Sequence, residues 1–106
     1  MAGLWPRWNI TTAGVSESRI ARRVVVHGRV QGVFFRDSCR REALEAGVDG
    51  WVSNVADGSL HAQFEGTPEG VERLVAWTRR GPRHATVERV DVHEVQVEGL
   101  SGFEVR

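Results

Sequence analysis

The chain of 106 residues has the length of one domain, and its 41% hydrophobic and 26% charged residues are typical of a globular protein. No apolar run is long enough for a spanning helix, and none predicts a secretory signal. Acidic and basic residues balance at 14 each, which argues against a partner held by bulk charge, such as duplex nucleic acid or an anionic membrane. The single cysteine, Cys39, excludes an intrachain disulfide, and the four scattered histidines lack metal-ligand spacing. We therefore expect a reducing, cytoplasmic setting and a site without metal or cofactor.

The charges separate along the chain, and every Lys or Arg position is Arg. Residues 20–41 carry six Arg against a single acid, Asp37, whereas residues 42–106 carry six Arg against twelve acids. This separation predicts a local anion site on an acidic domain. A solvated basic helix face is the alternative.

The first part of the chain predicts an extension, a strand and a helix. Residues 1–20 show no periodicity and mix Gly, Pro, Ser and Thr, which indicates a flexible N-terminal extension. A β-branched run from Val24 to Val30 is typical of a buried strand. A helix is expected over residues 37–46, with Asp37 as a cap or first-turn residue and Gly47 after its end.

The next segment, residues 51–65, predicts a β-hairpin. Asp57 and Gly58 are expected to form its two-residue turn. In the second arm the residues alternate, so Gln63 and Glu65 are expected to face outward while the apolar positions face the core.

The rest of the chain predicts a helix and two strands. The helix begins at the Thr67 cap and ends before Gly81. A strand is expected over residues 87–97, where the apolar positions change from even to odd and predict a bulge near 91–94. Residues 103–105 form a short edge strand.

This order of elements, strand–helix–strand–strand–helix–strand, predicts an α+β ferredoxin-like sandwich over residues 21–106. Right-handed crossovers place both helices on one face of a four- to five-stranded antiparallel sheet. Because this fold supports many functions, the fold alone does not predict an activity.

The segment from Gly28 to Arg36 carries the strongest functional signal. It leaves a strand, turns through Gly32 and enters a helix, so its main-chain N–H groups are expected to point outward together and bind an anion. Gly32 lets the main chain approach the anion, and Arg36 adds a planar fork that can bind two oxygens. The glycine spacing fits neither the dinucleotide fingerprint nor a Walker loop. An ordinary turn with a surface arginine would give the same pattern.

Two motifs in this chain resemble the signatures of the acylphosphatase family. They are RVQGVFFR at residues 29–36 and GWVSNVADG at residues 50–58, with weaker agreement at 64–66, 81–87 and 102–106. The likeness covers residues 22–106. It implies an enzyme with the same split sandwich that hydrolyses the carboxyl–phosphate anhydride of small acyl phosphates without a cofactor.

The resemblance also implies roles for individual residues. It makes Arg36 the phosphate-binding arginine and Asn54 the residue that holds the attacking water. The loop whose amides cradle the phosphate consists of Gln31, Gly32, Val33, Phe34 and Phe35. Many family members have arginine directly before the asparagine, where this chain has Ser53, so a positive charge near the predicted site is missing. Taken alone, Asn54 is also typical of an ordinary edge residue before a turn.

The chemistry implied by the resemblance needs few side chains. A carboxylate leaves without a general acid because the pKa of its conjugate acid is near ~4. Phosphoryl transfer then requires mainly positioning and charge stabilisation. An amide cannot take a proton from water, so we expect a phosphate oxygen of the substrate to take it.

Other candidate residues and functions are less favoured. His27 and His61 lie on predicted strands and are expected to be exposed or hydrogen-bonded, and Cys39 is expected to be a buried, inert thiol. A non-catalytic module that senses an anion is one alternative function, and an RNA-binding module is another. Balanced charge and the lack of a base-stacking motif argue against RNA. We expect a monomer that binds neither nucleic acid nor membranes.

Overall fold

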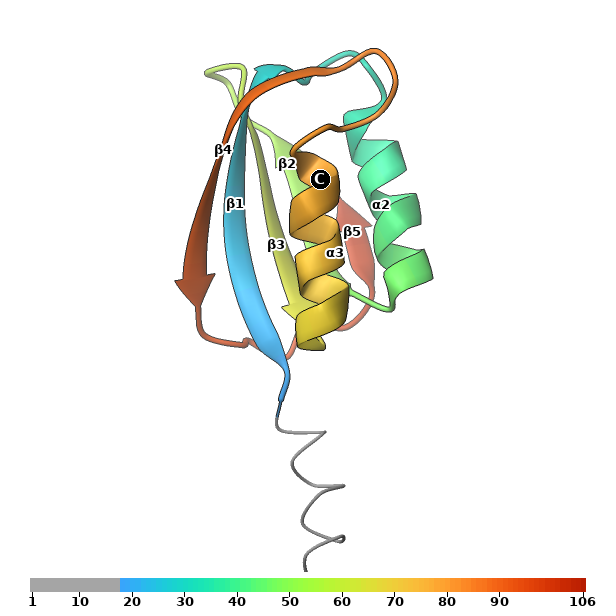
Figure 1. Cartoon of the computed structure of the whole chain (residues 1–106), viewed down its shortest axis with the longest axis vertical. Coiled ribbons are helices and arrows are strands. Elements are labelled where there is room, and N and C mark those ends of the chain that lie inside the picture. The colour runs from blue at the N-terminus through green and yellow to red at the C-terminus, as the bar shows by residue number, and fades with distance from the viewer. Residues whose placement is uncertain (1–17) are drawn as a thin grey trace, which may run out of the picture.

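Residues 18–106, which this computed structural model describes, form five strands and two helices in the expected order (Figure 1). The strands are β1 (Ile20–Arg29), β2 (Asp49–Asn54), β3 (Leu60–Gly66), β4 (Thr86–Val95) and β5 (Phe103–Val105), and the helices are α2 (Phe35–Ala46) and α3 (Pro68–Thr78). The predicted extension over residues 1–20 lies almost wholly outside the described residues, so its flexibility stays a prediction.

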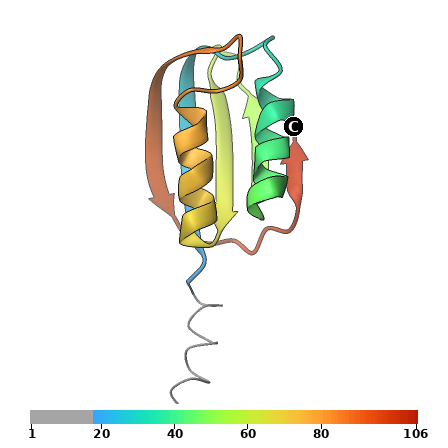
Figure 2. The same cartoon turned by 45° about the vertical axis from the view of Figure 1, so that its right-hand side comes forward.

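The strands form one sheet in the order β4-β1-β3-β2-β5. Neighbouring strands are antiparallel except β2 and β5, which are parallel. Both helices cover the same face of the sheet, with α2 over β2 and β5 and α3 over β1 and β3 (Figure 2). The predicted ferredoxin-like α+β sandwich is therefore confirmed, but the prediction of a wholly antiparallel sheet is wrong at β5.

The core lies between the helices and the sheet. Val24 and Val26 of β1 lie two residues apart on the side facing the helices and are fully buried there, as alternation along a strand requires. Phe35 from α2 and Trp77 from α3 meet edge to face, with ring centroids 5.1 Å apart. The Cys39 thiol is buried in the same layer, as predicted.

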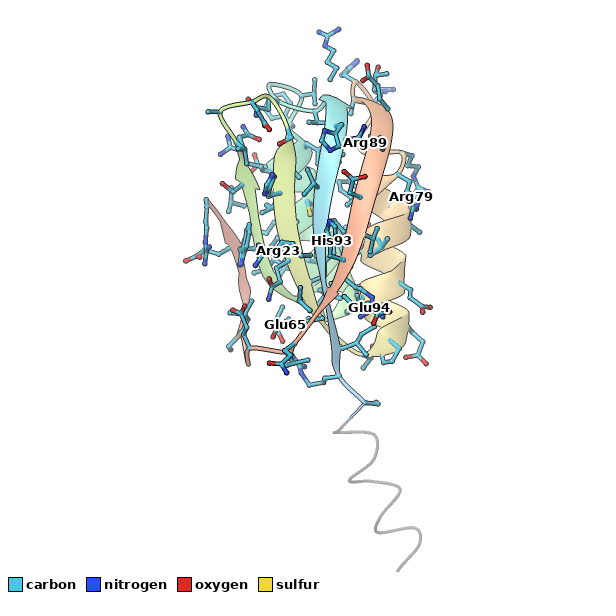
Figure 3. The ribbon with its side chains drawn as sticks, turned by 90° about the vertical axis from the view of Figure 1, so that its left-hand side faces the viewer. Arg23, Glu65, Arg79, Arg89, His93 and Glu94 are labelled. Carbon is cyan, nitrogen blue, oxygen red and sulfur yellow. The ribbon has the colours of Figure 1, made fainter. Side chains whose placement is uncertain are left out.

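The face of the sheet without helices differs from its prediction. Gln63 and Glu65 do face away from the helices, but both are fully buried rather than exposed. The connection from β4 to β5 crosses this face, and Glu65 accepts hydrogen bonds from the main-chain N–H groups of Glu98, Gly99 and Leu100 at 2.9, 3.1 and 3.0 Å (Figure 3 labels Glu65). Alternation along β3 predicts the direction of a side chain but not what covers it.

The predicted two-residue turn of the hairpin is wrong. The last paired residues are Asn54 and Leu60, so the loop has five residues, 55–59. Gly58 has φ +94°, but Asp57 does not have the positive φ that a primed turn requires. Instead, the Asp57 carboxylate accepts hydrogen bonds from the N–H and the hydroxyl of Ser59, which stabilises the longer loop.

Two other local features also differ from prediction. The helix α2 begins at Phe35, two residues before its predicted start, and has no side-chain cap. The irregularity of β4 lies at Glu88, the extra residue where the pairing with β1 shifts, rather than at 91–94. In β4 the apolar residues change from even to odd positions because Val95 pairs with Ala21 on the helix-free face. No bulge is therefore needed at 91–94. The predicted cap at Thr67 is confirmed by its 3.1 Å bond from the N–H of Gly70.

Candidate active site

A hollow of about 380 Å³ lies at the end of the sheet where α2 begins. The loop after β1, the last residue of β2 and the last residue of β5 meet there, close to the C-terminus, which is marked beside α2 in Figure 2. Its walls are formed by Val30, Gly32, Phe34, Phe35, Arg36, Asp37, Asn54 and Val105. The structure thus brings Arg36 and Asn54 together, although Arg36 lies in α2 and β3 separates the preceding strand β1 from β2 in the sheet.

The loop before α2 has an unusual main-chain conformation. Gly32 has φ +75° and Phe34 has φ +62°, whereas the residues between and beside them do not have positive φ. Such alternation turns successive N–H groups to one side and forms a concave anion site. Among residues 18–106, no group accepts a hydrogen bond from the main-chain N–H of Gly32, Val33 or Phe34. A Cβ added at Gly32 would meet only open space, so this glycine is required by its φ.

Val33 and Gln31, the two loop residues that do not line the hollow, hold the loop in place. The Val33 side chain is buried in the core. The Gln31 side-chain amide donates to the main-chain oxygens of Val55 at 2.7 Å and of Ser59 at 3.0 Å. Gln31 therefore ties the loop before α2 to the loop that follows Asn54.

Arg36 is held by the C-terminal strand. Its Nη1 donates a 3.0 Å hydrogen bond to the main-chain oxygen of Arg106. The N–H of Arg106 in turn donates to the oxygen of Val52 at 2.8 Å, and its guanidinium carbon lies 4.7 Å from the centre of a Trp51 ring. The sequence gives no signal for this contact, because it depends on β5 lying parallel to β2.

Asn54 brings a polar group to the hollow without a partner for it. Its Oδ1 is buried and has no hydrogen-bond partner in the described structure. A buried carbonyl oxygen without a donor is costly, and such groups in native proteins often have a functional reason. Asn54 therefore has the property expected of a residue that receives a hydrogen bond from a bound molecule.

The remaining candidates lie away from the hollow. Ser53 pairs with His61 on the helix-free face, so its side chain lies on the opposite face from the Asn54 side chain, and its hydroxyl donates to the main-chain oxygen of Asn54 at 3.1 Å. The Nε2 of His27 lies 3.0 Å from the Asp91 carboxylate, as expected for a hydrogen-bonded histidine. Burial, aided by the nearby Glu42 carboxylate, raises the pKa of the Cys39 thiol far above its usual value, so the thiolate is not available as a nucleophile.

Comparison with known proteins settles the family. The model of the acylphosphatase family matches residues 22–105, most of the chain. The chain belongs to the acylphosphatase family. An acylphosphatase of Thiobacillus denitrificans is 58% identical over 76% of this chain and 90% of its own length. One of Rubrobacter xylanophilus is 51% identical over 88% of this chain and 87% of its own length.

Solved structures of the acylphosphatase family have the same fold. The acylphosphatase from Coxiella burnetii superposes with a TM-score of 0.82 and 37% identity, covering 86% of this chain and 96% of that one. The acylphosphatase from Bacillus subtilis gives a TM-score of 0.79 and 32% identity, covering 82% and 98%. The predicted family is therefore confirmed, and with it the class of enzyme. Within residues 18–106 no helix is long and apolar enough to cross a membrane.

Proposed function

We propose that this acylphosphatase hydrolyses the carboxyl–phosphate anhydride of small acyl phosphates, with the loop 31–35 and Arg36 binding phosphate and Asn54 positioning the water. One observation carries the proposal: the buried Oδ1 without a partner belongs to Asn54, which lines the same hollow as Gly32 and Arg36. A water acceptor and an anion site thus lie together.

Phosphate binding is proposed to occur in front of Gly32. The N–H groups of Gly32, Val33 and Phe34 have no acceptor among the described residues, and the N-terminus of α2 adds its positive dipole. Arg36 donates one N–H to the oxygen of Arg106, and its other N–H groups remain to bind phosphate in the hollow that it lines. These groups stabilise the charge on the three equatorial oxygens in the transition state, where each donor contributes roughly 10²–10³ in rate.

The water is proposed to donate one hydrogen bond to Asn54 Oδ1 and to attack phosphorus opposite the carboxylate. The new bond joins the water oxygen to phosphorus, and the bond that breaks joins phosphorus to the acyl oxygen, which keeps the electron pair. The water proton passes to a phosphate oxygen, because a neutral amide cannot accept it. The products are a carboxylate and dihydrogen phosphate, so atoms and charges balance.

Three further properties form part of the proposal. The main-chain amides and Arg36 supply the charge stabilisation that a metal gives in other phosphoryl-transfer enzymes, so we expect activity without metal. One chain supplies every wall of the hollow, which suits a monomer. The single, buried cysteine suits the reducing cytoplasm.

The test measures hydrolysis of benzoyl phosphate and acetyl phosphate in the presence of EDTA, with inhibition by inorganic phosphate as a second readout. Arg36→Ala should lose most activity and bind phosphate much more weakly. Asn54→Ala should lose about 10²-fold in kcat while its inhibition constant for phosphate stays close to that of the parent. Ser53→Ala is the matched control, because Ser53 is the chain neighbour of Asn54 on the opposite face of the sheet.

The proposed roles would be wrong if Asn54→Ala kept the parent kcat, or if Arg36→Ala kept the parent inhibition constant for phosphate. A folded parent protein that binds phosphate but hydrolyses neither substrate would instead indicate the non-catalytic anion-binding module.

A further inference from the structure

Phe34 combines two features that do not stabilise the fold. It is 78% exposed, more than any other large hydrophobic residue within residues 18–106. Its φ of +62° lies in the left-handed region, which bulky residues rarely occupy. A ring with so little buried area adds little to stability, and glycine would adopt this conformation with less strain.

The position of Phe34 relates these features to the hollow. Phe34 lies between Gly32 and Arg36, the two residues proposed to bind phosphate, and it lines the hollow together with Val105. Val105 comes from β5 and is also partly exposed. The mouth of the hollow therefore has an apolar rim beside the anion site.

The direction of the proposed reaction places the substrate's acyl group at this rim. In an in-line displacement the leaving group lies opposite the attacking water. The Asn54 Oδ1 that would hold the water is buried, whereas Phe34 is exposed. The line from water through phosphorus to the carboxylate thus runs from the buried floor of the hollow toward its exposed rim.

We propose that Phe34 forms the subsite for the acyl group and favours acyl phosphates with an aromatic acyl group over acetyl phosphate. The inference rests on the proposed function and specifies its substrate class. A flat ring packed on Phe34 in an offset or edge-to-face contact removes apolar surface of both rings from water. An acetyl methyl group covers far less of the Phe34 side chain. The strained main chain at Phe34 serves two purposes, since it directs the N–H groups toward phosphate and presents the ring beside it.

The test compares kcat/KM for benzoyl phosphate with kcat/KM for acetyl phosphate in the parent and in Phe34→Ala. The ratio of these two values should fall about tenfold in Phe34→Ala, the loss typical of removing an apolar contact in a binding pocket. Phe34→Leu keeps an apolar side chain and should give an intermediate ratio. Leu44→Ala is the matched control, because Leu44 is an exposed apolar residue of α2 that does not line the hollow, and its ratio should equal the parent's.

Each outcome of this test separates the inference from the proposed function. If Phe34→Ala lowers kcat/KM equally for both substrates, the acyl subsite is wrong while the acylphosphatase activity stands. Such a result would mean that the ring serves the loop conformation or an unrelated surface. If the folded parent hydrolyses neither substrate, the proposed function fails and the subsite fails with it. Thermal unfolding of each variant establishes that the compared proteins are folded.

Discussion

The carboxylate of Glu65 gives the sharpest prediction about stability. It is fully buried, and each oxygen accepts two hydrogen bonds. Oε1 receives the N–H groups of Gly99 and Leu100, and Oε2 receives the N–H of Glu98 and the amide of Gln63, all at 2.9–3.1 Å. The three bonds from Glu98, Gly99 and Leu100 anchor the connection that leads from β4 to β5, and the fourth comes from β3 itself.

The substitution Glu65→Gln keeps the size of the side chain but not its acceptors. The new amide nitrogen must face two donors, whichever way the amide is turned. The Gln63 amide cannot simply reverse, because its oxygen already accepts two bonds from Arg23, at 2.8 and 2.6 Å. Two charge-assisted bonds are lost and buried donors are left unpaired, so we expect the free energy of unfolding to fall by about 3 kcal/mol at pH 7.

The pH dependence of this loss follows from the pKa of Glu65. Burial opposes the charged form, but the N–H groups of Glu98 and Leu100, the Gln63 amide and the N–H of Gly99 outweigh it and hold the pKa below its usual value. A carboxyl group whose pKa is lower in the folded state stabilises the fold above its unfolded pKa of about 4.3. That stability is lost as the pH falls through the folded pKa. The difference between parent and Glu65→Gln should therefore be largest above about pH 5 and shrink below pH 4.

The assay is urea unfolding followed by far-ultraviolet circular dichroism at several pH values between 3 and 7. Glu72→Gln is the control, since Glu72 is exposed on α3 and its loss should change the free energy of unfolding by less than about 0.5 kcal/mol. The reasoning would be refuted if Glu65→Gln lost less than about 1 kcal/mol at pH 7, or if its loss did not change with pH.

Three further predictions concern the site and the main chain. Arg36→Lys should recover little of the activity lost in Arg36→Ala, because an ammonium lacks the planar fork; benzoyl phosphate hydrolysis at more than a tenth of the parent rate would contradict this. Methionine has about the same length as glutamine but no hydrogen-bond donor, so Gln31→Met should release the loop after Asn54 and lower kcat. The inhibition constant for phosphate should change less than kcat. Equal changes in both would show a general loss of structure. Gly50→Ala should cost more than about 3 kcal/mol of unfolding free energy, because its Cβ would lie 1.8 Å from the oxygen of Gln63. Gly58 also has positive φ, but a Cβ added there would meet nothing within 4 Å. Gly58→Ala should therefore lower the free energy of unfolding by about 1 kcal/mol in the same urea assay.

Features that depend on neighbouring residues could be predicted from the sequence. Thr67 before a proline predicts the start of α3, and Gly47 predicts the end of α2, because caps are satisfied within one turn of the helix. The step from β1 through Gly32 to Arg36 predicts an anion site for the same reason, since the N–H groups at the start of a helix lack partners in any tertiary context.

Which distant segments meet could not be predicted from the sequence and follows from the packing of the folded chain. Alternation along β3 predicts that Glu65 faces away from the helices, but its burial depends on a connection that lies more than thirty residues later in the chain. Asn54 and Arg36 share one hollow because β5 and α2 close the end of the sheet beside β2. The left-handed Phe34 likewise arises from how the loop joins β1 to α2, since nothing in the residue itself favours that conformation. Local hydrogen bonding fixes caps and turns, whereas coverage of a face and closure of a site depend on packing between segments that are far apart in the sequence.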